Sequence, residues 1–186
     1  MDPYVRCKTC EFVMKKGKLG EVCPACAVPA KMLEDFKPRV SEKRMKILEL
    51  DIHPVIVHAP QAFAFSIVVF SIVALIARGA LRANLETTIV VLGILLPFTV
   101  LGAIGSGLFD GKIRYKKLKT PLLIRKIILG STFFVISAVG FVITVALGAD
   151  HASYLALMLI ISGAGFICSS FLGIIGSRLR CAAFPG

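Results

Sequence analysis

Four long apolar segments occupy most of the chain after residue 50 and restrict what it can fold into. They are residues 55–77, 87–109, 127–147 and 154–175, and none contains an ionised side chain. Each is long enough for a helix to cross the hydrocarbon core of a bilayer, which takes about twenty residues. Lipid offers no hydrogen-bond partners to a backbone, so such segments must form helices. The sequence therefore predicts an all-α membrane domain, a four-helix transmembrane bundle, over residues 52–180.

The composition supports a membrane protein and argues against one that binds nucleic acid. The hydrophobic fraction is 56% and the formal net charge is +11, a combination too apolar and too basic for an ordinary soluble domain. The basic residues lie beside the apolar segments, without the interleaved aromatic residues of a soluble nucleic-acid-binding domain. Membrane lipid is therefore the expected partner, and both homo-oligomers and hetero-oligomers are compatible with such a chain.

The basic residues near the apolar segments are concentrated on one side of the predicted membrane. Only Arg78 and Arg82 lie on the other side. The concentrated set consists of Lys43, Arg44, Lys46, Lys112, Arg114, Lys116, Lys117, Lys119, Arg125, Lys126, Arg178 and Arg180. Because basic residues favour the cytoplasmic side, we expect a multi-pass protein of the cytoplasmic (inner) membrane with both termini in the cytoplasm.

Two C-x2-C pairs near the N-terminus predict a metal site. Cys7-Lys8-Thr9-Cys10 and Cys23-Pro24-Ala25-Cys26 are separated by an arm of twelve residues. Each pair can place two sulfurs on one side of a tetrahedral ion, and the ion replaces the hydrophobic core that so short a segment cannot build. The spacing fits a structural zinc and a redox iron equally well, because thiolate tetrahedra suit both metals.

The residues around these cysteines resemble the rubredoxins, in particular the short rubredoxin modules at the end of rubrerythrins. The resemblance covers about Tyr4 to Phe36 and lies in the stretches 4–13 and 23–33. It implies a small β module over residues 1–36, one iron held by the four thiolates of Cys7, Cys10, Cys23 and Cys26, and one-electron transfer. Rubredoxins usually have glycine directly after the second cysteine of each pair, whereas this chain has Glu11 and Ala27, so zinc stays the alternative metal.

A basic linker, residues 37–51, joins the cysteine module to the apolar segments, and residues 181–186 form a C-terminal tail. Lys37-Pro38-Arg39-Val40 interrupts any regular pattern, and Ser41 is a suitable N-cap for a short helix that continues to Leu50. Basic and apolar residues alternate in this helix. It is compatible with a helix on the membrane surface and with an ordinary charged connector.

Two histidines and one aspartate lie where the first two apolar segments reach the basic side. His53 lies just before the first segment, His58 lies near its start, and Asp110 follows the second segment. On a straight helix His58 lies about 7.5 Å deeper than His53 and about 140° around the axis, so the two are poorly placed to hold one ion. We take His58 and Asp110, with His53 as a third residue, as candidates for binding a cofactor. The alternative is interfacial anchoring, with His53 solvated.

The His53-Pro54-x-x-x-His58-x-Pro60 opening resembles a prokaryotic four-helix membrane family of unknown function. The small residues that precede Asp110 and the end of the last segment around Gly173 share this resemblance, which covers about residues 52–180. Many members of that family also have a histidine early in the third segment, where this chain has Arg125 and Lys126. That difference argues against a haem held by two histidines of one chain. Small residues such as Gly163 and Gly165 predict close helix packing.

Two functions follow from these features. The first is an electron-transfer protein, in which a cytoplasmic iron tethered to the membrane exchanges electrons with a quinone, a haem or a membrane oxidoreductase. The second is a non-redox membrane protein, a transporter or an assembly factor, with a structural zinc ribbon. The chain has no nucleophile–base pair and no nucleotide-binding motif, so we expect an electron carrier or an oxidoreductase subunit rather than a self-contained enzyme.

Overall fold

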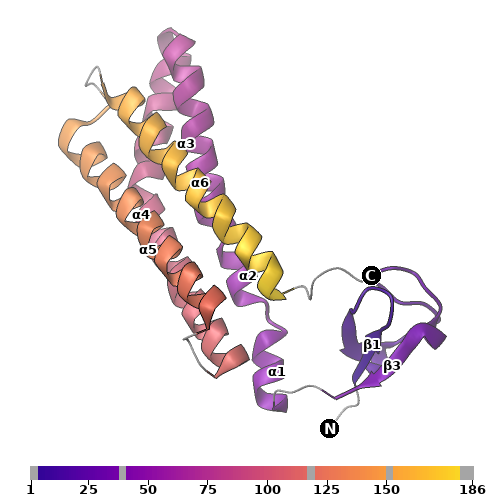
Figure 1. The fold of residues 1–186 in the computed structure, drawn as a ribbon. Helices are drawn as coiled ribbons and strands as arrows, with labels where there is room; N and C mark the ends of the chain where they lie inside the picture. The colour runs from indigo at the N-terminus through magenta and orange to yellow at the C-terminus, as the bar shows by residue number, and fades with distance from the viewer. Residues whose placement is uncertain (1–3, 38–40, 117–119, 150–152, 181–186) are drawn as a thin grey trace. The chain divides into compact units, whose positions relative to one another are not determined.

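The computed structural model describes residues 4–37, 41–116, 120–149 and 153–180 (Figure 1). The chain divides into two compact units, of which the first ends at Leu50 and the second runs from Asp51 to Leu179. The first unit contains a small antiparallel sheet and the second contains long apolar helices. The predicted fold class, a small β module followed by an all-α four-helix domain, is confirmed.

The sheet of the first unit has three strands in the part of the chain that is described. Strands β1 (Tyr4–Cys7), β2 (Val13–Lys15) and β3 (Leu33–Phe36) pair antiparallel in the order β2-β1-β3. Val5 on the central strand is opposite Met14 on one side and Asp35 on the other, and its side chain is buried. The central strand ends at Cys7, so the sheet fixes the position of the first cysteine.

The rest of the module is made of turns. The basic segment after β2 forms a short 3-10 helix, Lys16–Lys18, and a second one, Ala30–Met32, precedes β3. Around the second cysteine pair the described residues form the isolated antiparallel bridge Val22↔Pro29 instead of a second hairpin of two strands. In the linker, helix α1 (Glu42–Leu48) begins after Ser41, as predicted, although the Ser41 side chain makes no capping hydrogen bond.

The second unit is a four-helix bundle. Its four long helices are α3 (His58–Ile76), α4 (Gly79–Tyr115), α5 (Pro121–Leu147) and α6 (Tyr154–Arg180), and the short helix α2 (Ile52–Ile56) precedes α3. Among the described residues, four helical stretches are long and apolar enough to cross a membrane, which confirms the four predicted segments. Helix α4 packs between α3 and α5, while α6 contacts α3 through Phe65 and Phe166 and α5 through Gly165 and Phe133 (Figure 1).

Helix α4 extends beyond the predicted apolar segment at both ends. Residues 79–86, expected in a connector, are helical, and a salt bridge of 2.8 Å between Arg82 and Glu86 lies along the helix surface. At the other end Asp110 and Arg114 are paired four residues apart in the same helix. Hydropathy identifies the part of a helix that is apolar enough to lie in lipid. The helix itself can continue beyond that part where helix propensity and side-chain pairs along its surface stabilise it.

The first membrane segment is interrupted near its start. A turn at Val57 separates α2 from α3, and Pro60 lies in the first turn of α3. Proline has no N–H to donate to the carbonyl of the residue four positions earlier, Ile56, so the interruption occurs where the helix would need that bond. Pro97, by contrast, lies within the continuous helix α4.

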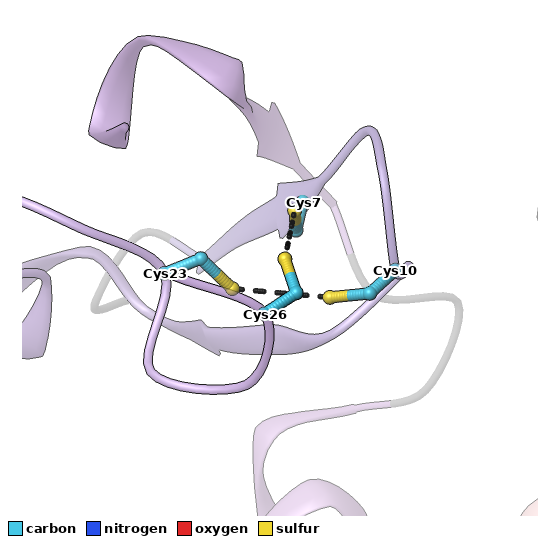
Figure 2. A group of neighbouring side chains, drawn as sticks. All are labelled: Cys7, Cys10, Cys23 and Cys26. Carbon is cyan, nitrogen blue, oxygen red and sulfur yellow. Dashed lines mark hydrogen bonds between the residues drawn. The ribbon is translucent and has the colours of Figure 1, made fainter. Parts of the chain in front are cut away.

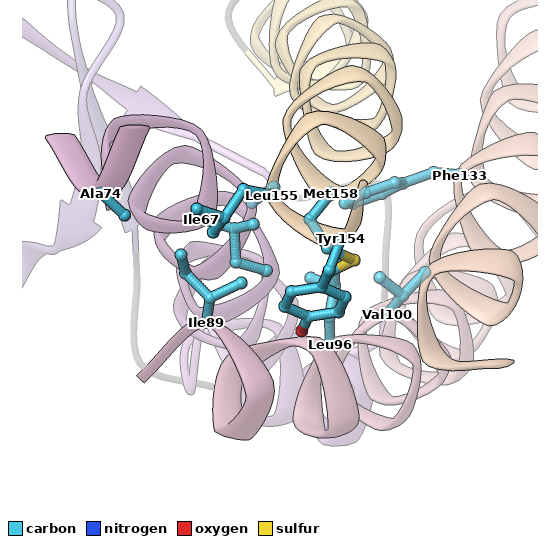
Figure 3. Close-up of a cluster of buried hydrophobic side chains, with 10 residues drawn as sticks. Ile67, Ala74, Ile89, Leu96, Val100, Phe133, Tyr154, Leu155 and Met158 are labelled. Carbon is cyan, nitrogen blue, oxygen red and sulfur yellow. The ribbon is translucent and has the colours of Figure 1, made fainter. Parts of the chain in front are cut away.

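The core of the bundle combines large and small side chains. Ile67, Ile89, Tyr154 and Met158 are fully buried in its centre (Figure 3). Many large apolar side chains lie on the outer surface instead, among them Ile76, which is 80% exposed. An apolar outer surface around a tightly packed centre is what a helical bundle in lipid requires.

Candidate metal centre

The two cysteine pairs adopt the same local structure. The backbone N–H of Cys7 donates to the carbonyl of Phe12 at 2.9 Å, and the N–H of Cys23 donates to that of Val28 at 2.8 Å. In each pair the residue four positions after the first cysteine, Glu11 or Ala27, donates its N–H back to that cysteine's carbonyl. The two turns are therefore equivalent knuckles at equal spacing, as the repeated C-x2-C motif predicts.

Each knuckle needs a left-handed residue directly after its second cysteine. Glu11 has φ of 59° and Ala27 has φ of 60°. Glycine adopts this conformation without strain, whereas other L-residues bear a cost of about 1–2 kcal/mol. These are the two positions at which the sequence departs from the rubredoxin pattern. The departure does not prevent the turn, but it places strain in both knuckles.

The four sulfurs converge on one point between the knuckles (Figure 2). The Sγ atoms of Cys7 and Cys26 are 3.7 Å apart, those of Cys10 and Cys23 are 3.8 Å apart, and all four lie within 4.8 Å of one another. A tetrahedral ion with metal–sulfur bonds of about 2.3 Å requires sulfurs about 3.8 Å apart. A disulfide would bring two sulfurs to about 2.05 Å, so these are free thiols. The set fits a tetrahedral thiophilic ion such as iron or zinc.

The site has a buried side and a more open side. Cys7 and Cys23, the first cysteines of the two knuckles, are 0% and 1% exposed. Cys10 and Cys26, the second cysteines, are partly exposed. An ion in this cage is therefore shielded from water on one side, while the sulfurs on the other side are accessible from the module surface.

Backbone N–H groups and neighbouring sulfurs shift the ionisation of Cys7 and Cys26 in opposite directions. A bond from the backbone N–H of Cys10 stabilises the Cys7 thiolate and lowers the pKa of Cys7 to about 6. The N–H of Val28 favours the Cys26 thiolate in the same way, but burial and the three neighbouring sulfurs outweigh it and raise the pKa of Cys26 to about 12. Four thiolates this close repel one another, so a cation is needed to hold all of them deprotonated near pH 7.

An ion pair next to the knuckles connects strands β1 and β3. Arg6 on β1 donates to Glu34 on β3 at 2.8 Å, and its guanidinium lies 5.5 Å from the ring centre of Phe36. The hydrogen bond from Arg6 lowers the pKa of Glu34. The sequence analysis did not predict this ion pair. The alternation of residues on strands that pair across the sheet is the signal that could have identified it.

The predicted membrane-site residues lie in different surroundings. His58 is exposed, and Asp110 pairs with Arg114 at 3.4 Å. His53, for which we considered a solvated position, is instead partly buried and contacts Ser106 and Lys126. Within the described segments, no interaction joins His58 to either of the other two candidates.

Comparisons of the chain with protein-family models, curated proteins and solved structures gave no match. The description of the metal-binding module and of the bundle therefore depends on this chain's own residues. They form a module with a four-cysteine metal-binding cluster, followed by a helical bundle capable of spanning a membrane.

Proposed function

We propose that the protein is a membrane-anchored electron carrier in which Cys7, Cys10, Cys23 and Cys26 hold one iron ion. The observation that carries this proposal is the cage of four sulfurs, built by two equivalent knuckles and open on one side only. An iron held in this way supplies a change of one electron between its ferrous and ferric states. Because the backbone fixes all four cysteine sulfurs, these sulfurs move little when the charge of the iron changes.

The residues around the sulfurs support this role in two ways. Backbone N–H groups next to Cys7 and Cys26 favour the charged form of these sulfurs and so influence the potential of a bound metal. The partly exposed sulfurs of Cys10 and Cys26 offer a short route to a partner docked on the module surface. The buried side of the cage excludes water. Electrons would therefore be exchanged with a partner through the partly exposed side.

The bundle has the role of a membrane anchor that keeps the iron module close to a redox partner in the same membrane. A tether raises the effective concentration of the module at such a partner without any additional contact. We propose that the partner is a quinone, a haem or a membrane oxidoreductase, and that His58 and Asp110 contribute to its binding site. The module faces the cytoplasm in this account, where thiols stay reduced and available to a metal.

The test is to reduce the iron in membranes and to follow its reoxidation after a quinone is added. His58→Ala and Asp110→Asn should slow reoxidation without changing the iron content. Arg82→Gln, at the opposite end of the bundle, is the control and should behave as wild type. Reoxidation at the wild-type rate in both variants would remove His58 and Asp110 from the proposal. Iron that quinone leaves reduced in the wild-type protein would point to a separate protein as the partner.

A further inference from the structure

The linker helix α1 belongs to the same compact unit as the metal module. This unit includes the chain up to Leu50, and the membrane bundle begins with the next residue. The hydroxyl of Tyr4 on β1 donates to Glu49 Oε1 at 3.0 Å, directly after the end of α1. Whatever holds α1 in place therefore also restricts the position of the metal module.

One face of α1 is exposed and combines basic with apolar side chains. Lys43 lies three residues before Lys46 and four before Ile47, and Leu50 follows these two after four and three residues, so all four lie on one side of the helix. Ile47 is 37% exposed and Leu50 is 65% exposed. The N–H of Leu50 donates to the Ile47 carbonyl at 3.2 Å and so continues the last turn. The opposite side of the helix is half-buried and consists of Arg44, Met45 and Leu48.

The chain keeps this exposed face close to the membrane. The first apolar segment begins at residue 55, and an extended chain from Leu50 to that residue would cover at most about 18 Å. Part of this stretch is the helix α2, which is shorter than extended chain. So short a tether gives α1 a high effective concentration at the lipid head groups beside the bundle.

The composition of the exposed face fits an anionic membrane surface. Lysine side chains are long enough to reach lipid phosphates while large apolar side chains next to them enter the boundary between head groups and acyl chains. Anionic head groups attract basic residues at this depth. An acidic protein would also satisfy the lysines, but the lipid surface is the partner that the tether keeps within reach.

We propose that the exposed face of α1, formed by Lys43, Lys46, Ile47 and Leu50, binds the anionic lipid surface beside the bundle. The two ammonium groups contact lipid phosphates, and the two apolar side chains enter the acyl boundary. The contact of Tyr4 with Glu49 then limits the orientations of the metal module above the membrane. The proposal concerns α1 and the lipid, so it stands whether or not the bound metal transfers electrons.

The test is hydrogen exchange of the backbone amides of residues 42–50 in the full-length, metal-loaded protein. The protein is placed at one copy per nanodisc, in phosphatidylcholine alone and in phosphatidylcholine mixed with phosphatidylglycerol. We expect exchange in the mixed lipid to be slower by about fivefold or more, because anionic head groups hold the helix at the surface.

Two pairs of lysines separate a specific contact from general attraction. Lys43→Gln combined with Lys46→Gln should remove most of the difference between the two lipids. Lys18→Gln combined with Lys31→Gln is the matched control, because it removes the same charge from exposed positions of the same unit, and it should keep the difference.

The apolar contribution is tested in the same way. Leu50→Gln should reduce the difference between the lipids, whereas Val22→Gln, which alters a side chain 49% exposed in the metal module, should keep it. The replaced side chains are all exposed, so exchange in phosphatidylcholine alone should match the wild type and show that α1 itself is intact.

Four outcomes would overturn the proposal. Equal exchange of the wild-type protein in both lipids would make α1 a solvated connector. Equal loss in the two lysine pairs would mean diffuse attraction of a basic protein. Slow exchange in both lipids that no variant changes would mean that contacts within the protein hold α1. Slow exchange that appears only in discs with two copies would make a second copy of the chain the partner.

Discussion

At the scale of single residues, the metal module depends on two strained positions. Glu11 and Ala27 take up left-handed backbone conformations that glycine would adopt freely. Each knuckle nevertheless closes with the same pair of backbone hydrogen bonds. A metal bound by the four thiolates would contribute far more to folding than one left-handed backbone conformation costs, and so would compensate the strain.

Replacing Ala27 by glycine should therefore stabilise the module. We expect the metal-loaded protein to resist urea-induced metal release better by up to about 1 kcal/mol, because relief of strain exceeds the added flexibility of the unfolded chain. Ala25→Gly in the same knuckle is the control, since Ala25 is exposed and has no left-handed backbone, and it should destabilise the module slightly. Similar losses in both variants would show that the φ angle at Ala27 carries no strain.

Metal binding should strengthen as the pH rises. In the metal-free module Cys26 holds its proton up to a pKa of about 12, and the metal must displace that proton. The metal-bound form carries fewer protons, so its apparent affinity should increase by at least about tenfold per pH unit between pH 7 and pH 9. Below the Cys7 pKa of about 6 a further proton competes and the dependence should steepen. Competition with a chelator, corrected for the chelator's own titration, measures this slope, and a flat profile would contradict it.

The cysteine ligands could be predicted from the sequence, whereas the polar contacts of His53 in the bundle could not. The metal site is defined by short-range spacing, because each C-x2-C pair forms its knuckle from adjacent residues. The contact between His53 and Lys126 joins residues 73 positions apart and depends on how α2 and α5 pack. The apolar segments and the distribution of basic residues predict that both residues lie on the basic side of the membrane, but not that their side chains meet.

At the scale of the elements, close approach of helices is set by particular glycines. The sequence showed that the last membrane segment is rich in small residues, without showing which of them touch a neighbour. Gly165 is in contact with the Phe133 ring, and a Cβ there would lie 2.9 Å from that ring. Gly163, two residues earlier, faces open space. Helix ends were also mislocated from the sequence, since α4 continues through residues expected in a connector.

Gly165→Ala should consequently destabilise the bundle, while Gly163→Ala should not. The added methyl group forces Phe133 away from α6, and overpacking of this kind costs about 1–3 kcal/mol. Gly163→Ala adds the same atoms on the same helix without a contact, so it is the matched control. The loss of helical circular dichroism on heating in detergent measures both variants. Equal midpoints for the two would mean that α5 and α6 pack less closely than described.

At the scale of the whole molecule, the two units are stabilised by different physical effects. We expect the metal module to rely on metal–ligand bonds, because a segment of this size buries too little apolar surface to fold well alone. The bundle relies on the transfer of apolar helices into lipid. Loss of the metal should therefore unfold the module and leave the helices inserted.

The orientation of the bundle is a prediction that labelling in intact cells can test. Asn84→Cys, in the exposed first turns of α4, should react with an impermeant thiol reagent from outside. Lys116→Cys, at the other end of α4, should react only after the membrane is opened. The wild-type protein gives the background from its own cysteines. Labelling of Lys116→Cys alone in intact cells would place the metal module in an oxidising compartment and contradict a reduced tetrathiolate site.

The central claim, a redox iron on four thiolates, is tested most directly by the metal content and visible absorption of the purified full-length protein. Produced with iron and zinc both supplied, it should contain one iron per chain and show thiolate-to-iron absorption that disappears on reduction and returns in air. Cys10→Ser should lose both, and Cys168→Ser, which alters a cysteine outside the cluster, should keep both. A colourless wild-type protein with one zinc per chain would contradict the claim and make the module a structural zinc ribbon.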